Sequence, residues 1–263
     1  MIQIGTRKVG YGQPCFVIAE AGVNHNGKLD VAKQLVDVAV KAGCDAVKFQ
    51  TFKRTKDDFP DISQDEFDRF RNIPNLSYDE FIELKKYCDS KHIIFFSTPH
   101  SLGAIDFLAS IVPVYKIASP SLTRDYFIKR VKIKGLPIIA STGSITNQNK
   151  KATMEQVDHF LSLMSSTNLA LLYCVSQYPC YNFSQHDFVA FRDRYEAYPI
   201  GFSSHSKDIE YSLQAVELGA CIIEQHITLA DDFKCPDSNV SLNPRELSEL
   251  VRTIRIIEEG NEK

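Results

Sequence analysis

The chain has 263 residues, of which 44% are hydrophobic and 24% charged, and its formal net charge is −3. These values are typical of a globular protein with one large core. The net charge gives no argument for binding to nucleic acid or to an anionic membrane, neither of which is expected as a partner, so any anion site must be local. No apolar run approaches the roughly 18 residues of a membrane span, and the first residues lack the apolar stretch of a signal peptide. The odd number of cysteines, without a CxxC pair, favours a reducing cytoplasm over a disulfide framework.

The elements predicted along the chain alternate between strand and helix. Residues 1–14 contain three glycines among β-forming residues, which predicts a small hairpin. Eight short apolar runs follow, each ending in residues that can bind charge: 16–20, 46–50, 93–98, 114–119, 137–142, 169–176, 200–205 and 221–226. Helical periodicity separates the runs, as in 29–42 before Gly43. This pattern predicts a single (β/α)₈ barrel over residues 1–263, with the hairpin at its bottom and the active site at its C-terminal mouth.

Three further segments carry local signals. The sequence at 77–80 has the pattern of a capping box, and Asn243 with Pro244 predicts the start of a last helix that ends before Gly260. The polar insertion at 52–75 interrupts the regular strand spacing. It is equally consistent with a lid beside the active site and with a solvated decoration.

Two lysines lie inside apolar strands, Lys48 in the second and Lys116 in the fourth. Burying an ammonium group is costly without an anionic partner, so each lysine indicates either a structural ion pair or a bound anion. Serine and threonine hydroxyls at other strand ends favour a phosphate or carboxylate ligand. If the lysines are unpaired without that ligand, replacing either one should change stability little.

Two histidines end the last two strands at the same height, His205 and His226. A pair of imidazoles in this position suits a divalent transition metal, although a histidine at a strand end is often only hydrogen-bonded. Glu20 ends the first strand, which lies next to the eighth when the barrel closes. It could orient a water bound to the metal.

At these residues the chain strongly resembles the sialic acid synthase (N-acetylneuraminate synthase) family. The matching motifs are FVIAEAGVNHNG (16–27), AVKFQT (46–51), FSTP (96–99), YKIAS (115–119), IASTG (139–143), CVSQYP (174–179), GFSSH (201–205) and EQH (224–226). The resemblance covers essentially the whole chain. It implies a metal-dependent condensation of phosphoenolpyruvate with the open-chain aldehyde of an amino sugar, which yields a 2-keto-3-deoxy acid and phosphate.

The resemblance also assigns site residues. The family's phosphoenolpyruvate site maps onto Lys48, Thr98, Lys116, Ser119, Ser141, Ser176 and Ser203. Positions near the metal or the sugar acceptor map onto Glu20, Gln50, Tyr178 and Asp237. The metal ligands map onto His205 and His226, with Mn²⁺ expected first and Mg²⁺, Co²⁺ or Zn²⁺ as alternatives. Catalytic roles fall to Glu20, Lys48 and Lys116: the lysines neutralise the trianionic substrate while the metal polarises the aldehyde oxygen.

The sequence departs from the family on the acceptor side. Pro120 and Ser121 stand where the family has Gly-Glu, Ser204 replaces an aspartate, and His100 replaces an apolar or aromatic residue. The C-terminal antifreeze-like domain of family members, which reaches into a partner subunit's site, is expected to be lacking. An acceptor other than free N-acetylmannosamine is therefore expected, and the protein could act as a homodimer or with a partner protein.

Two alternative functions remain open from the sequence. A 3-deoxy-octulosonate-phosphate type of synthase would use a phosphorylated aldose, for which Lys53, Arg54 and Lys56 offer a weak basic cluster. A catalytically silent homologue would bind phosphoenolpyruvate as a regulator. Loss of the carboxylate at Ser121 supports the silent homologue, and the retained lysines and histidines oppose it.

Overall fold

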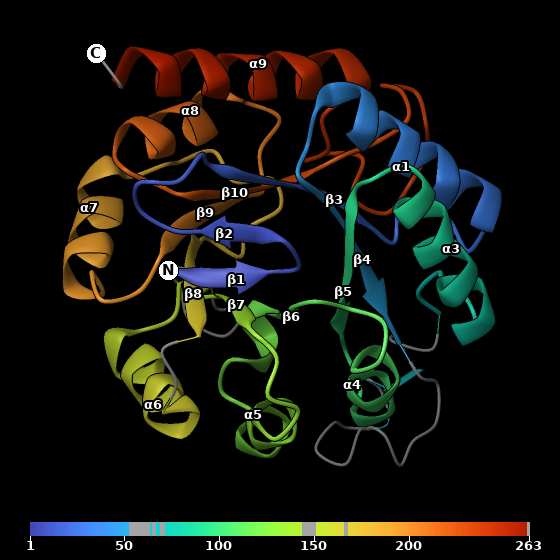
Figure 1. Ribbon diagram of the computed structural model, residues 1–263, viewed down its shortest axis with the longest axis horizontal. Helices are drawn as coiled ribbons and strands as arrows, with labels where there is room; N and C mark the ends of the chain where they lie inside the picture. Colours follow the sequence, from blue (N-terminus) through green and yellow to red (C-terminus); the bar gives the residue numbers. More distant parts are fainter. Residues whose placement is uncertain (53–63, 65–66, 69–71, 144–150, 166–167, 262–263) are drawn as a thin grey trace.

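A parallel eight-stranded sheet forms the wall of a barrel in the computed structural model, which describes residues 1–52, 64, 67–68, 72–143, 151–165 and 168–261 (Figure 1). The sheet order is β5-β4-β3-β10-β9-β8-β7-β6, and the edge strands β5 and β6 contact each other to complete the ring. The strands are β3 (Phe16–Gly22), β4 (Ala46–Thr51), β5 (Ile94–Pro99), β6 (Tyr115–Ile117), β7 (Ile138–Ser141), β8 (Leu169–Cys174), β9 (Ile200–Ser204) and β10 (Ile222–His226). The predicted (β/α)₈ barrel is confirmed.

Helices surround the barrel on the outside (Figure 1). They are α1 (Leu29–Ala42), α3 (Tyr78–Ser90), α4 (Leu102–Leu108), α5 (Asp125–Lys132), α6 (Met154–Met164), α7 (Gln185–Arg194), α8 (Glu210–Glu217) and α9 (Pro244–Asn261). None of the helices within the described ranges is long and apolar enough to cross a membrane. Because helices cover one face of each strand and barrel side chains the other, the strands are long apolar runs rather than alternating ones.

The helix boundaries follow the sequence signals with one exception. Gly43 ends α1 with a φ of 79°, and Ser77 and Glu80 form the predicted capping box of α3. The side chain of Asn243 accepts a hydrogen bond from the backbone N–H of Glu246 at 3.0 Å, as predicted for the start of α9. The predicted stop before Gly260 is wrong, because α9 continues to residue 261. A glycine inside a helix costs only about 1 kcal/mol, so it ends a helix only where the chain takes up a left-handed conformation.

The predicted hairpin is present at the N-terminus. Strands β1 (Ile2–Ile4) and β2 (Arg7–Val9) pair in antiparallel register, and their inward side chains join the hydrophobic core. The turn at Gly5 lies next to Pro113, and Gly10 lies next to Pro199. These prolines precede barrel strands, so the hairpin covers the N-terminal end of the barrel and leaves the opposite end for the site.

Most of the insertion predicted at 52–75, with its basic cluster at 53–56, lies outside the described residues. Its two ends are joined, because the side-chain amide of Asn75 donates a hydrogen bond to the carbonyl oxygen of Phe52 at 2.9 Å. Next to this junction, Ile73 and Pro74 line the pocket at the barrel mouth.

Candidate active site

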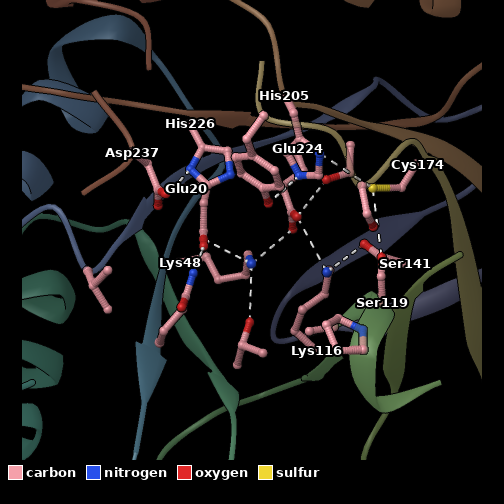
Figure 2. A pocket seen from close by; sticks show the side chains of 18 of the residues that line it. Glu20, Lys48, Lys116, Ser119, Ser141, Cys174, His205, Glu224, His226 and Asp237 are labelled. Carbon is pink, nitrogen blue, oxygen red and sulfur yellow. Dashed lines mark hydrogen bonds and ion pairs between the residues drawn. The ribbon is translucent and has the colours of Figure 1, made fainter. Parts of the chain in front are cut away.

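A pocket of about 350 Å³ opens at the C-terminal ends of the barrel strands (Figure 2). All the residues predicted for the site line it: Glu20, Lys48, Gln50, Thr98, Lys116, Ser119, Ser141, Ser176, Tyr178, Ser203, His205, His226 and Asp237. They converge because parallel strands end at the same rim, and the register places Glu20 beside both Lys48 and His226. The position of these side chains at one mouth agrees with the prediction, whereas their chemical roles remain predictions.

Four buried charges form a connected cluster across the barrel. Lys48 Nζ lies 2.9 Å from Glu20 Oε2 and 3.4 Å from Glu224 Oε2. The other oxygen of Glu224 lies 3.4 Å from Lys116 Nζ. Glu224 therefore bridges the two lysines, as Figure 2 shows, and connects β4 to β6 through a side chain from β10.

The sequence left open whether each lysine belongs to a structural ion pair or binds an anion, and the structure shows a carboxylate partner for each within the barrel. The expectation that replacing a lysine changes stability little assumed unpaired lysines, and it therefore loses its basis. The lysine side chains are only 4% and 3% exposed, so a paired carboxylate is what makes their burial tolerable. Replacing either lysine would remove one of the two cations that pair with the buried Glu224. We therefore expect either replacement to lower the free energy of unfolding.

Hydroxyl groups complete the coordination of the lysines. Lys48 donates a hydrogen bond to Thr98 Oγ1 at 3.2 Å, and Lys116 donates to Ser141 Oγ at 2.7 Å. Ser203 donates to Glu224 Oε1 at 3.0 Å. A hydroxyl can rotate from accepting to donating, so these groups can turn toward an anionic ligand while the carboxylates hold the ammonium groups in place.

The electrostatic balance differs between the two lysines. Burial lowers the pKa of Lys48, but Glu20 and Glu224 outweigh it, and the net shift is upward. Burial also lowers the pKa of Lys116, and there Glu224 does not compensate fully. Burial alone would raise the pKa of Glu224, yet the two lysines bring it below its usual value. The difference in direction follows the contacts, because Lys48 has two carboxylate partners and Lys116 has Glu224.

The two histidines lie beside this cluster with their ring centroids 5.5 Å apart. The Nδ1 atom of His205 is 2.7 Å from the carbonyl oxygen of Val175, which fixes the hydrogen on Nδ1 and leaves Nε2 as an acceptor, 2.7 Å from the Tyr178 hydroxyl. Burial lowers the pKa of His205 to about 3, so its ring is neutral. His226 Nδ1 lies 3.4 Å from Asp237 Oδ2, and this carboxylate raises the pKa of His226 against the effect of burial.

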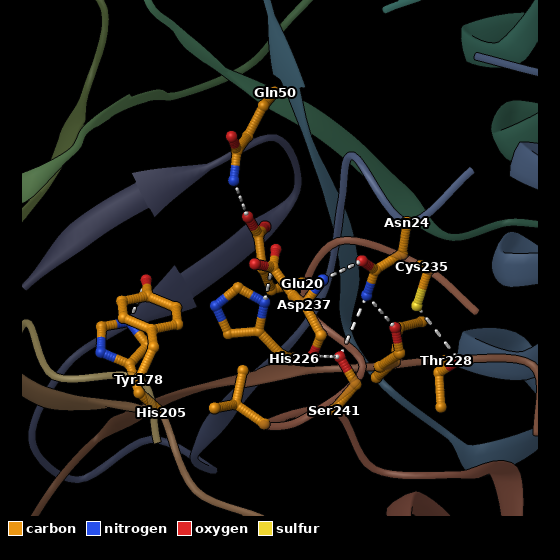
Figure 3. Close-up of polar contacts among 12 residues, drawn as sticks. Glu20, Asn24, Gln50, Tyr178, His205, His226, Thr228, Cys235, Asp237 and Ser241 are labelled. Atoms are coloured by element: carbon orange, nitrogen blue, oxygen red, sulfur yellow. Dashed lines mark hydrogen bonds and ion pairs between the residues drawn. The ribbon is translucent and has the colours of Figure 1, made fainter. Parts of the chain in front are cut away.

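A loop after β10 brings Asp237 to the histidines (Figure 3). The backbone N–H of Asp237 donates to Asn24 Oδ1 at 3.0 Å, and the Asn24 amide donates to Ser241 Oγ at 3.0 Å. Gly22 has a φ of 53°. A Cβ atom at this position would lie 3.2 Å from Glu20 Oε1 and 3.4 Å from Asp237 Oδ2. The glycine at this position is thus required both by its left-handed backbone and by the close approach of these side chains.

Comparison with known proteins shows the family of this chain. The model of the NeuB family matches residues 35–262. The chain is 35% identical to an N,N'-diacetyllegionaminic acid synthase of Legionella pneumophila, over 95% of this chain and 74% of that protein. It is 33% identical to human N-acetylneuraminate-9-phosphate synthase, over 96% of this chain and 72% of that protein. A crystal structure of N-acetylneuraminic acid synthetase from Leptospira borgpetersenii superposes with a TM-score of 0.85 at 33% identity, covering 98% of this chain and 88% of that one.

The chain belongs to the NeuB family. These relatives are named as synthases of sialic-acid type, so the similarity does not favour the octulosonate-phosphate or silent-homologue alternatives.

Sequence reasoning missed two residues that line this NeuB-family pocket. Glu224 stands two residues before His226 in the same strand, and a carboxylate inside an apolar strand was the signal that could have found it. Cys174 is a buried residue, only 1% exposed, and its thiol also lines the pocket 3.8 Å from Ser119 Oγ. Burial raises the pKa of Cys174 to about 11, so it remains a thiol at neutral pH.

Two of the sequence departures lie behind the pocket surface. Ser121 is 2% exposed, and it does not line the pocket, although Ser119 and Pro120 of the same 3₁₀ turn do. Ser204 is fully buried, and its hydroxyl accepts a hydrogen bond from the backbone N–H of Ser206 at 3.3 Å. The other two departures, His100 and Pro120, line the pocket directly.

Proposed function

We propose that this protein condenses phosphoenolpyruvate with the open-chain aldehyde of an amino sugar, releasing a 2-keto-3-deoxy acid and inorganic phosphate. C3 of the enol forms a bond to the aldehyde carbon, water adds at C2, and phosphate leaves. One observation carries the proposal. A NeuB-family barrel brings two buried lysines and a ring of hydroxyls to the same pocket as two histidines and a carboxylate. The cysteine content supports a reducing compartment such as the cytoplasm for this reaction.

The lysine half of the pocket suits the phosphoenolpyruvate anion. Lys48 and Lys116 supply two fixed positive charges, and preorganised charges of this kind stabilise charge that develops during a reaction. The surrounding hydroxyls add donors without adding charge: Thr98, Ser119, Ser141, Ser176 and Ser203. In the reaction proposed here, Lys48 and Lys116 would bind the anionic groups of the substrate and then stabilise the departing phosphate.

The histidine half suits a divalent metal ion. No group of three or more His, Cys, Asp or Glu side chains poised for a metal occurs within the described part of the chain. Two imidazoles nevertheless fit, because their centroid separation of 5.5 Å is bridgeable by metal–nitrogen bonds of about 2.1 Å. The Nδ1 atom of His226 lies 3.4 Å from Asp237 Oδ2, and a carboxylate in this position can orient a metal-binding imidazole. His205 and His226 would hold the ion, Mn²⁺ being the first candidate, and when bound it would act as a Lewis acid toward the aldehyde oxygen.

The acceptor side would be formed by polar groups on the rim next to the histidines. Gln50 donates a hydrogen bond to Glu20 Oε1 at 3.1 Å, which fixes both side chains toward the pocket (Figure 3). Tyr178 and Asp237 complete this side. Because Ser121 offers no carboxylate to a sugar hydroxyl, we propose an acceptor other than free N-acetylmannosamine.

Phosphate release with a panel of acceptors tests this function. The protein is incubated with phosphoenolpyruvate, Mn²⁺ and separate aldoses and N-acyl hexosamines, and the products are identified by mass spectrometry. We expect release of phosphate only with an amino-sugar acceptor, together with a product whose mass equals both substrates plus water minus phosphoric acid. Release with phosphorylated simple aldoses alone, or no release with any acceptor despite binding of phosphoenolpyruvate, would contradict the proposal.

A further inference from the structure

His100 lies at the edge of the lysine half of the pocket, directly after β5. Its backbone N–H donates to the carbonyl oxygen of Thr51 at 3.0 Å, which ties it to the neighbouring strand. Its ring stacks on Phe52, with centroids 4.5 Å apart and an interplanar angle of 6°. The position and plane of the imidazole are therefore fixed by the protein.

The Nε2 atom of this ring is buried and has no hydrogen-bond partner among the described residues. Buried polar groups in proteins nearly always have a partner, so an exception inside a pocket needs an explanation. A ligand in the pocket is the simplest one, since His100 is itself among the lining residues.

The charges around His100 indicate that it belongs to the lysine half of the pocket rather than to the histidine half. Burial lowers its pKa to about 3, and the positive charges of Lys48, Arg124 and Lys116 act in the same direction. The ring is therefore neutral and carries one N–H group. The charged groups that lower the pKa of His100 are all cations, and no carboxylate of the pocket is among its main causes. An oxygen that reaches Nε2 in this field would best be anionic.

We propose that His100 binds phosphoenolpyruvate directly, with its Nε2–H donating a hydrogen bond to an anionic oxygen of the substrate. This inference rests on the proposed function and adds a residue to the donor half of the site. The anion selects the imidazole tautomer with hydrogen on Nε2, and the stack on Phe52 holds the ring in place before the substrate arrives. A hydrogen bond to a charged group is stronger than a neutral one, so its loss should weaken binding about 10- to 100-fold.

Binding of phosphoenolpyruvate alone, measured by isothermal titration calorimetry without acceptor, separates this role from packing. His100→Phe keeps an aromatic ring on Phe52 and removes the N–H, whereas His100→Gln keeps a donor. We expect the dissociation constant to rise about 10- to 100-fold in His100→Phe and by less in His100→Gln. His186→Phe serves as the control, because the side chain of His186 is 92% exposed and outside the pocket.

Each outcome has a distinct meaning. Unchanged binding in His100→Phe, or equal losses in His100→Phe and His100→Gln, overturns the inference. Unchanged phosphoenolpyruvate binding with a raised KM for the sugar would place His100 at the acceptor instead and also overturns it. If the wild-type protein does not bind phosphoenolpyruvate, the proposed function fails together with this inference. Circular dichroism of both variants shows whether they fold, and a His100→Asn variant replaces any that does not.

Discussion

Replacing Glu224 by glutamine would test the charge cluster most directly. The substitution keeps the shape of the side chain and the oxygen that accepts the hydrogen bond from Ser203. It removes the negative charge that lies 3.4 Å from Lys48 Nζ and 3.4 Å from Lys116 Nζ. Lys48 would retain Glu20, but Lys116 would lose its carboxylate partner while remaining buried.

The size of the effect follows from these distances. At 3.4 Å and an effective dielectric constant of about 20, each lysine gains about 5 kcal/mol of gross attraction from the carboxylate. Part of this gain is offset because glutamine is cheaper to bury than a carboxylate. Removing one partner of a buried ion pair typically costs about 3–5 kcal/mol, which we expect for the free energy of unfolding of Glu224→Gln. In a protein of this size the cost corresponds to a melting temperature lower by roughly 6–20 °C.

Denaturant unfolding without ligand measures this loss, with Glu83→Gln as the matched control. Glu83 pairs with Lys33 at 2.5 Å on the surface, where the two side chains are 58% and 30% exposed, so its replacement should cost about 0–1 kcal/mol. Phosphoenolpyruvate should stabilise Glu224→Gln at least as much as the wild type, by about 2.7 kcal/mol at 100 times Kd, because the freed lysine gains an anion. The reasoning is refuted if Glu224→Gln and Glu83→Gln lose the same small amount of stability.

Three further predictions follow from the same geometry. Lys116→Ala should lower the rate of phosphate release by roughly 10²-fold or more, and its unfolding free energy should also fall because Glu224 loses a partner; wild-type turnover would count against the donor site. His226→Ala should lose high-affinity Mn²⁺ binding in a metal titration of the purified protein, and equal stoichiometry and affinity to the wild type would disprove the assignment of the ligand. Free N-acetylmannosamine should be a poor acceptor that Ser121→Glu alone does not fully rescue, because Ser121 lies behind the pocket surface; efficient turnover of about 1 s⁻¹ in the wild type would show the acceptor argument to be wrong.

The barrel could be predicted from the sequence because its signals are local. Each strand is a short apolar run that ends in polar residues, and each helix has its own start and stop residues. The exact ends of the strands could not be predicted in every case. The fourth strand was expected over 114–119 but is only Tyr115–Ile117, because Ser119 and Pro120 turn into a short 3₁₀ helix. Pro120 has no N–H to continue a ladder, which accounts for the early end.

The site residues could be predicted for a related reason, since strand ends of a parallel barrel meet at one rim. The contacts that these side chains make with one another could not be predicted. Alternation along β10 shows that Glu224 shares a face with His226, but it does not show that the carboxylate reaches both Lys48 and Lys116. That contact joins three strands that are distant in sequence, and it depends on side-chain lengths and on the curvature of the closed barrel.

The paired lysines also change what the pocket can be expected to select. Because Glu20 and Glu224 already balance Lys48 and Lys116, a ligand must compete with two carboxylates for the same ammonium groups. A monoanion gains little from this exchange, since it offers no more charge than the carboxylate it would displace. A trianion with several oxygens can contact both lysines and the hydroxyl groups at the same time. The internal ion pairs thus make the lysines tolerable in the barrel and at the same time favour a multiply charged substrate over simple anions.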